Sequence, residues 1–471
     1  MSFSYYWYDY ETWGLDPRWY PPSQFAGIRT DEDFNEIGEP LNIYNQPTED
    51  LLPDPGACLV TGITPQLAFE KGVPEPEFTK QIRNELMQPG TLSLGYNTIR
   101  FDEEFNRYLF WRNFYDPYQH TWGDDRGRWD IIDLVRMTRA LRPYGIEWPV
   151  DDEGKPSNRL ELLSVANDIS HADAHDALSD VRATIALAKL IRERQPRLYH
   201  YLKSHRDKHS LKQLLTPIMS VPVVHTSDMY SSDYFKTSLV LPIAMDPEDR
   251  GDVVVFDLRQ DPDIILDMSS DDLREAIFKP KDQRKDGEVR PALKTIKLNR
   301  APAVAPFGVL DKKSCDRIQL DMEKVDAHIR KLRAARGIEE KIRSALKSER
   351  TVEPMPAEAR LYEGFVGDTD KQTMNRVHST PPENLDTLDF KDERLNELLF
   401  HYRGRHHSST LSDEEQVKWH DFVVQKLTKY SPMTFERFGG ALQEAANDPQ
   451  NADKKALLEE LQIYAESVYP Y

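Results

Sequence analysis

The chain has few cysteines, no long apolar run and no excess of basic residues. Among 471 residues it has only Cys58 and Cys315, without the spacing of a zinc site or the density of a disulfide scaffold. Two lone thiols are typical of a reducing compartment, so we expect a cytoplasmic protein whose cysteines fill core positions. No run of eighteen apolar residues occurs, and we therefore expect no membrane-spanning helix. The acidic, aromatic N-terminus MSFSYYWYDY does not predict a signal peptide.

Basic residues are outnumbered by acidic residues, 61 to 80, which gives a formal net charge of −19. This balance argues against a general nucleic-acid coat protein. It is compatible with a nuclease, because bound metal offsets active-site acids and a basic groove can lie on an acidic body. Any grip on DNA is then expected to be local and salt-sensitive.

Carboxylates that are far apart in the sequence form the most informative pattern. Asp9 and Glu11 lie in YYWYDYETWG, where the aromatic residues and the flanking Gly14 and Pro17 predict a strand. On a strand, positions i and i+2 point to the same face, so these two carboxylates project together. Two adjacent like charges on one face repel each other unless a cation lies between them.

Two further acids and a histidine follow in segments that predict helices. TLSLGYN predicts a strand and DEEFNRYLFWRNF a helix, so Asp102 is expected near a helix N-terminus, where a negative charge is favourable. A third helix is expected to start at Asp173 or Asp176, with Asp180 in its interior and His175 at its frayed start. Its apolar stripe contains Ala177, Val181, Ile185 and Ala188.

These residue types suit metal-dependent phosphoryl chemistry. Carboxylate oxygens are hard ligands that hold Mg²⁺ or Mn²⁺, and a convergent acidic cluster is what two-metal phosphodiester hydrolysis needs. Each residue alone has an ordinary explanation: a D-x-E pair is usually a solvated strand edge, Asp102 a helix cap, His175 a surface histidine and Asp180 an exposed helical acid. Their combination in this order favours the metal site, with His175 as general base.

The order D-x-E-T, N-x-x-x-F-D and H-x-x-x-x-D resembles the DEDDh 3′–5′ exonuclease superfamily. Longer phrases resemble the bacterial exonuclease I family over most of the chain: TGITPQ, GYNTIRFDEEF, RNFYDPY, ALRPYGIEWP and PSNRLELLSVAN. The resemblance implies an α/β fold with a ribonuclease H-like mixed-sheet exonuclease domain at 1–195. It also implies an SH3-like β domain with a helical insert at 196–350 and an all-helical C-terminal domain at 351–471.

Residue patterns in the later part of the chain agree with that organisation. Short strand candidates separated by Asp, Gly and Pro turns begin at Val221. The charged stretch 312–350 predicts one or two exposed helices, and the prolines of 351–360 predict a linker. The segment 374–390 is expected to be a loop, and the runs after it predict helices.

The resemblance implies a processive, monomeric exonuclease that degrades single-stranded DNA to 5′-mononucleotides in DNA repair and recombination. Asp9, Glu11, Asp102 and Asp180 would hold two Mg²⁺ ions, with Mn²⁺ able to substitute, and Asp9 would bridge both. Single strands are held by aromatic platforms and basic side chains. The substrate contacts expected here are Glu11, Thr12, Trp13, Arg107, Tyr118, Trp122, Arg136 and Arg159.

Other residues of this region have more ordinary expectations. Trp111 and Trp129 fit helix faces and are predicted to be core, and Arg139 is expected either to pair with Asp133 or to be solvated. The family resemblance also implies a protein partner, the acidic C-terminal tail of single-strand DNA-binding protein, received at Arg142 near Tyr201. Two alternatives remain open: a 3′–5′ exoribonuclease, and a catalytically silent nucleic-acid-binding scaffold.

Overall fold

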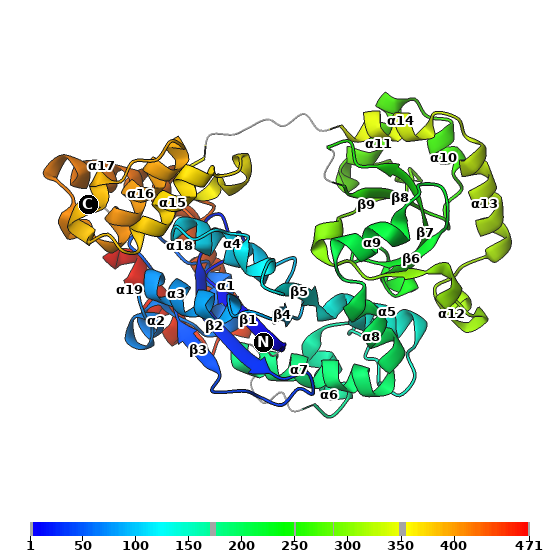
Figure 1. Cartoon of the computed structure of the whole chain (residues 1–471). Coiled ribbons are helices and arrows are strands. Elements are labelled where there is room, and N and C mark those ends of the chain that lie inside the picture. Colours follow the sequence, from blue (N-terminus) through cyan, green and yellow to red (C-terminus); the bar gives the residue numbers. More distant parts are fainter. Residues whose placement is uncertain (1–2, 170–175, 249–250, 286, 348–354, 470–471) are drawn as a thin grey trace. The chain divides into compact units, whose positions relative to one another are not determined.

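A computed structural model describes residues 3–169, 176–248, 251–285, 287–347 and 355–469 (Figure 1). The chain divides into two compact units. Unit 1 contains residues 1–128, 172–182 and 353–471, and unit 2 contains residues 129–171 and 183–352. In the described residues no helix is both long and apolar enough to cross a membrane.

The first sheet is mixed, as predicted for the N-terminal region. Its strand order is β3-β2-β1-β4-β5, in which β1 pairs antiparallel with β2 and parallel with β4. The aromatic segment forms β1, and TLSLG forms β4. The bounds are β1 Ser4–Thr12, β2 Pro22–Thr30, β3 Leu41–Tyr44, β4 Thr91–Gly95 and β5 Gly127–Asp130.

The strands β1 and β4 separate halfway along β1. Their register runs only from Ser4 to Trp7 on β1, and β4 ends at Gly95. A Cβ atom at Gly95 would lie 2.5 Å from the Tyr8 carbonyl oxygen and 2.2 Å from Thr98 Oγ1, so this close approach requires glycine. The second half of β1 therefore has an edge free of β4, where a helix can reach its backbone.

Helices from both ends of the chain pack into unit 1. Helix α1 contacts α18 and α19, and α2 contacts α19. One apolar core includes Tyr6 and Phe78 as well as Leu411 and Leu461, so the C-terminal helices share a core with the first sheet. The helices are α1 Pro55–Thr61, α2 Pro65–Lys71, α3 Glu75–Leu86, α4 Asp102–Arg112, α15 Asp368–Val377, α16 Glu393–His406, α17 Asp413–Gln425, α18 Phe435–Asn447 and α19 Lys455–Ser467.

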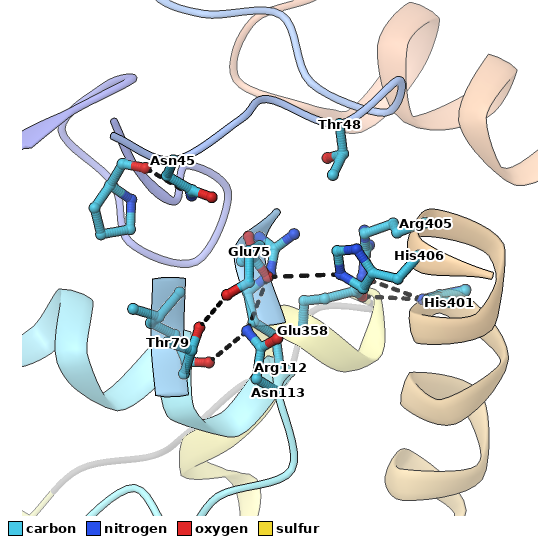
Figure 2. A network of polar contacts seen from close by, with 12 residues as sticks. Asn45, Thr48, Glu75, Thr79, Arg112, Asn113, Glu358, His401, Arg405 and His406 are labelled. Atoms are coloured by element: carbon cyan, nitrogen blue, oxygen red, sulfur yellow. Dashed lines mark hydrogen bonds and ion pairs between the residues drawn. The ribbon is translucent and has the colours of Figure 1, made fainter. Parts of the chain in front are cut away.

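A buried ionic network ties the C-terminal helices to the N-terminal part of unit 1. Asp50, which is fully buried, accepts from Arg405 Nε at 2.9 Å and from Lys426 Nζ at 2.6 Å. Arg405 also pairs with Glu358, which His401 Nδ1 approaches at 2.9 Å (Figure 2). Burial alone would raise the pKa of Asp50, but Arg405 and Lys426 hold that pKa well below its usual range.

Unit 2 contains an antiparallel sheet of order β10-β6-β7-β8-β9. Its core includes Val223, Val240 and Val255. Its strands are β6 Val223–Thr226, β7 Thr237–Met245, β8 Val253–Asp257, β9 Leu293–Ile296 and β10 Val304–Pro306.

The predicted helical insert lies between β8 and β9 as α10 Asp263–Leu266 and α11 Ser270–Phe278. The other helices are α5 Ile131–Leu141, α6 Leu160–Ala166, α8 Pro196–Ser204, α9 Lys208–Leu215, α12 Lys312–Arg317, α13 Met322–Ala334 and α14 Ile338–Leu346. Helix α7 (Ala177–Arg194) begins in unit 1 and continues into unit 2.

Three expectations about the later chain were wrong. The stretch 312–347 forms three helices rather than one or two, and its apolar positions, such as Val325 and Ile342, are buried. Part of the expected linker, residues 357–359, is buried instead of exposed. The Ala357 carbonyl accepts a hydrogen bond from Trp111 Nε1 at 2.9 Å, which joins this segment to α4. The expected loop begins inside α15, whose Met374 and Val377 pack in a core.

Replacing Arg405 by alanine should destabilise unit 1 strongly. The change removes a partner of both Asp50 and Glu358 while these carboxylates stay buried, and breaking a buried pair in this way costs about 3–5 kcal/mol. Thermal unfolding of Arg405→Ala should show a large fall in Tm. The control is Arg18→Ala, because Arg18 pairs with Asp16 at the surface, and such pairs contribute about 0–1 kcal/mol. Equal effects of the two variants would contradict a stabilising role for the network.

Candidate active site

Three of the predicted carboxylates converge at one place in unit 1. Asp9 and Glu11 project from β1, and Asp180 lies in the first turn of α7. Each side chain offers an oxygen that lies within 4.8 Å of the other two. In the described part of the chain, no other group of three or more acids, histidines or cysteines brings its ligand atoms within this distance of one another.

The fourth carboxylate, Asp102, is hydrogen-bonded to the backbone of β1. Asp102 is the first residue of α4 and is 2% exposed. Its Oδ1 accepts a hydrogen bond from the Tyr10 N–H at 3.0 Å, on the part of β1 that β4 has left. The predicted helix start therefore places Asp102 at the strand that carries Asp9 and Glu11.

The electrostatics of the group are those of crowded like charges. Burial, followed by the charges of Asp102, Glu11 and Asp180, raises the pKa of Asp9 well above its usual value. Burial and the charges of Asp180, Asp102 and Asp176 raise the pKa of Glu11 to about 8. Such oxygen donors fit a hard divalent cation such as Mg²⁺ or Mn²⁺, whose charge would offset this repulsion.

The predicted general base, His175, lies outside the described residues. The first described residue after it, Asp176, accepts from the Ser179 N–H at 3.1 Å and so caps the start of α7. This agrees with one of the two helix starts that the sequence allowed. Helix α7 buries Ala177 and Val181 and ends at Arg194, before Pro196.

Two expected substrate contacts, Thr12 and Trp13, face inward. Thr12 is 7% exposed, and its Oγ1 donates to the Gly14 carbonyl at 2.9 Å. Trp13 is 1% exposed and belongs to the apolar core. Contact of these two residues with the terminal nucleotide stays a prediction. The chain turns inward after Glu11, and both side chains lie in the turn beside the carboxylates.

Arg107, Tyr118 and Trp122 lie on or after α4. The Arg107 guanidinium lies 5.3 Å from the Tyr118 ring centroid and forms ion pairs with Glu103 at 3.3 Å and Glu104 at 3.5 Å. Tyr118 is half-buried, whereas Trp122 is 59% exposed. Trp122 is therefore the predicted aromatic contact that is most available to a ligand.

The predicted contacts of unit 2 differ in availability. Arg136 is buried and pairs with Asp133 at 2.9 Å and with Asp228 at 3.0 Å, so its charge is already used within the protein. The Arg159 side chain is 66% exposed beside Glu161, at the start of α6 as expected.

Three neighbouring residues were expected to have structural or solvated roles. Trp111 and Trp129 are buried, as predicted. Arg139 is buried rather than solvated, and it donates to the Pro149 carbonyl at 2.7 Å.

An exposed aromatic residue near Tyr118 was not predicted. Phe365 is 94% exposed and, with Tyr118 and Lys371, lines a small cavity of about 40 Å³. The signal in the sequence is an aromatic residue between two glycines in the segment EGFVGD. This segment lies outside residues 107–159, which contain the predicted aromatic and basic substrate contacts other than Trp13.

Arg142 and Tyr201, the predicted partner contacts, line one cavity in unit 2. Its volume is about 520 Å³, and Pro196, Arg197 and Leu198 also line it. Arg142 donates to the Val309 carbonyl at 2.7 Å, and Tyr201 stacks on His205 with ring centroids 4.2 Å apart. The structure thus brings two arginines and an apolar surface together.

Three family models match the chain. Residues 6–188 match a model described as Exonuclease, residues 206–348 match the Exonuclease I SH3-like domain, and residues 356–468 match the Exonuclease I C-terminal domain. Together the three matches extend over most of the sequence.

Similar proteins match nearly the whole length of the chain. Exodeoxyribonuclease I of Haemophilus influenzae is 43% identical over 467 residues, which are 98% of each protein. The crystal structure of Escherichia coli exonuclease I with a dA16 oligonucleotide matches with a TM-score of 0.95 and 41% identity, covering 99% of this chain and 100% of that one. A zinc-bound form of the E. coli enzyme with single-stranded DNA matches with a TM-score of 0.94 and 40% identity, over 99% and 100% of the two chains.

The raised pKa of Glu11 predicts a pH-dependent stability of the metal-free protein. A carboxyl whose pKa rises from 4.5 to about 8 on folding adds stability that is complete below about pH 4.5 and is lost as the pH rises toward 8. Mg²⁺ should therefore raise the Tm more at pH 8 than at about pH 5, by a few degrees (about 2–4 °C per kcal/mol for a domain of ordinary size).

Thermal unfolding with EDTA or with millimolar Mg²⁺ measures this difference. The Glu11→Gln variant is the control, because it removes the titrating carboxyl and should flatten the pH dependence. A Mg²⁺ effect of the same size at both pH values would contradict the predicted linkage.

Proposed function

The chain belongs to the exonuclease I family, and we propose that its carboxylate cluster hydrolyses the 3′-terminal phosphodiester of single-stranded DNA. The protein is a 3′–5′ exonuclease of single-stranded DNA. One observation carries the assignment of the site: acids from β1 and α7 converge within 4.8 Å, and Asp102 of α4 is bonded to the same strand.

The four carboxylates are proposed to hold two Mg²⁺ ions, with Mn²⁺ able to substitute. Asp9 would be a central ligand of the site, because the charges of Asp102, Glu11 and Asp180 all act on it. When bound, divalent cations lower the pKa of water and stabilise the charge of the leaving oxygen. Glu11 and Asp180 would each hold one ion, and Asp102 would act directly or through water.

His175 is proposed as the general base. An unperturbed imidazole has a pKa of ~6.5 and can accept a proton near neutral pH. In the sequence, His175 directly precedes the cap of the helix that carries Asp180. It would take the proton of the attacking water, and the products would be 5′-mononucleotides.

The strand is proposed to be held mainly by aromatic stacking. Trp122 and Phe365 expose their rings, and Tyr118 lines the same cavity as Phe365. Arg107 would keep the Tyr118 ring in place, and the exposed Arg159 would contact a phosphate. Stacking suits an enzyme without base preference, because every base offers a π face.

The division into domains at 1–195, 196–350 and 351–471 is proposed to serve processivity. The ranges of the three family models support these boundaries. The protein is further proposed to act as a cytoplasmic monomer in DNA repair and recombination.

The cavity at Arg142 and Tyr201 is proposed to receive the acidic C-terminal tail of single-strand DNA-binding protein. Two arginines at its wall suit a carboxylate, and Pro196 and Leu198 suit an apolar end residue. The recognition would combine charge with burial of an apolar side chain.

Digestion of matched oligomers tests the function. A 5′-labelled single-stranded DNA should shorten stepwise with Mg²⁺ and stay intact with EDTA, while a duplex and an RNA of the same sequence resist. Shortening of the RNA would move the substrate to RNA, and no cleavage at all would favour a silent scaffold.

Removing single groups tests the proposed roles. Asp180→Asn should lower kcat by about 10²–10⁴-fold, because metal charge stabilisation contributes several kcal/mol. His175→Ala should lower kcat by about 10²–10⁴-fold while DNA binding in Ca²⁺ stays near that of the wild type. The exposed Asp152 supplies the control Asp152→Asn, which should leave kcat unchanged. An equal loss of binding and turnover in His175→Ala would show that His175 is structural.

A further inference from the structure

A buried asparagine ties the helix that carries Asp102 to the strand that carries Asp9 and Glu11. Asn106 lies one turn after Asp102 on α4 and is 0% exposed. Its Oδ1 accepts from the Tyr10 hydroxyl at 2.7 Å, and its Nδ2 donates to the Tyr8 hydroxyl at 3.1 Å. A side chain with both an acceptor and a donor is required to make these two bonds.

Tyr8 and Tyr10 alternate along β1 with the catalytic carboxylates. Side chains alternate between the two faces of a strand, so Asn106 holds β1 from the face opposite to Asp9 and Glu11.

These bonds act where the sheet no longer holds β1 on that side. The pairing of β1 with β4 ends at Trp7, and beyond it α4 bonds to Tyr10 twice. The Tyr10 backbone N–H donates to Asp102, and the Tyr10 hydroxyl donates to Asn106. Two bonds one helical turn apart fix both the position and the rotation of α4 relative to β1.

We propose that Asn106 is a positioning residue, which sets the separation between Asp102 and the carboxylates of β1 and so tunes the affinity of the site for divalent cations. The proposal rests on the proposed function for its effect on catalysis. Mg²⁺ demands near-ideal coordination geometry, and a misplacement of about 1 Å can lower a rate by about 10²-fold. Asn106 is 0% exposed and its side chain bonds to the two tyrosine hydroxyls, so it would act on the site through β1.

The test is the pair Asn106→Ala and Tyr10→Phe in the full-length protein. Binding of Mn²⁺ is measured by the electron paramagnetic resonance signal of the free ion, which requires no activity. We expect the Kd for Mn²⁺ to rise by about 5–10-fold and kcat to fall by about 10–100-fold. The KM for single-stranded DNA should change by less than about 3-fold, because the strand-binding side chains are unaltered.

Asn113→Ala is the matched control. Asn113 caps the other end of α4, is 1% exposed, and donates from Nδ2 to Glu75 Oε1 at 2.9 Å. Its loss should lower the Tm but leave the Kd for Mn²⁺ and kcat near the values of the wild type. A general loosening of α4 would instead change all of these quantities in both variants.

Several outcomes overturn the proposal. A wild-type Kd for Mn²⁺ and a wild-type kcat in Asn106→Ala would do so, as would equal shifts in Asn113→Ala. If Asn106→Ala does not fold, Tyr10→Phe decides, because it removes only one hydroxyl. If the wild type binds Mn²⁺ but degrades no DNA, the proposed function fails, while the Kd values still judge the positioning role.

Discussion

The repulsion among carboxylates on β1, α4 and α7 is the constraint on which the site depends. Asp9 and Glu11 share a strand face, and Asp180 brings a third oxygen within 4.8 Å. Burial and mutual repulsion raise the pKa values of Asp9 and Glu11, so the fold holds the group together at the expense of stability. The surrounding bonds, such as the one from Tyr10 N–H to Asp102, keep it in the arrangement that a divalent cation stabilises.

A second acidic cluster in the same unit is buried and shows the opposite solution. Arg405 and Lys426 neutralise Asp50, and Arg405 also pairs with Glu358. The pKa values of Asp50 and Glu358 therefore lie well below the usual range despite their burial. One cluster carries its own cations and stabilises the packing of the C-terminal helices, whereas the pKa shifts of the other show an excess of negative charge. That contrast distinguishes a structural ionic core from a metal site.

Local patterns predicted the elements of the site well, because strand alternation and helix starts depend on residues only a few positions apart in the sequence. They placed Asp9 and Glu11 on one strand face, Asp102 at a helix start and Asp180 in a helix. They could not reveal Asn106 or the Asp50–Arg405 pair, since these bonds join residues 96 and 355 positions apart. The inward turn of Trp13 was likewise missed, because an aromatic residue beside an acidic pair looks the same whether it faces a core or a ligand.

The arginines of residues 107–159 illustrate how composition overstates the positive charge that is available to DNA. Arg107 faces Glu103 and Glu104, and Arg136 faces Asp133 and Asp228. A guanidinium that is already paired inside the protein releases few counterions when DNA arrives, so it adds little to the salt dependence of binding. With a net charge of −19, the protein has little charge to spare for a general electrostatic grip. Under the proposed binding of a single strand, exposed rings such as Trp122 and Phe365 would be the more effective contacts, because stacking selects unpaired bases and does not require a basic surface.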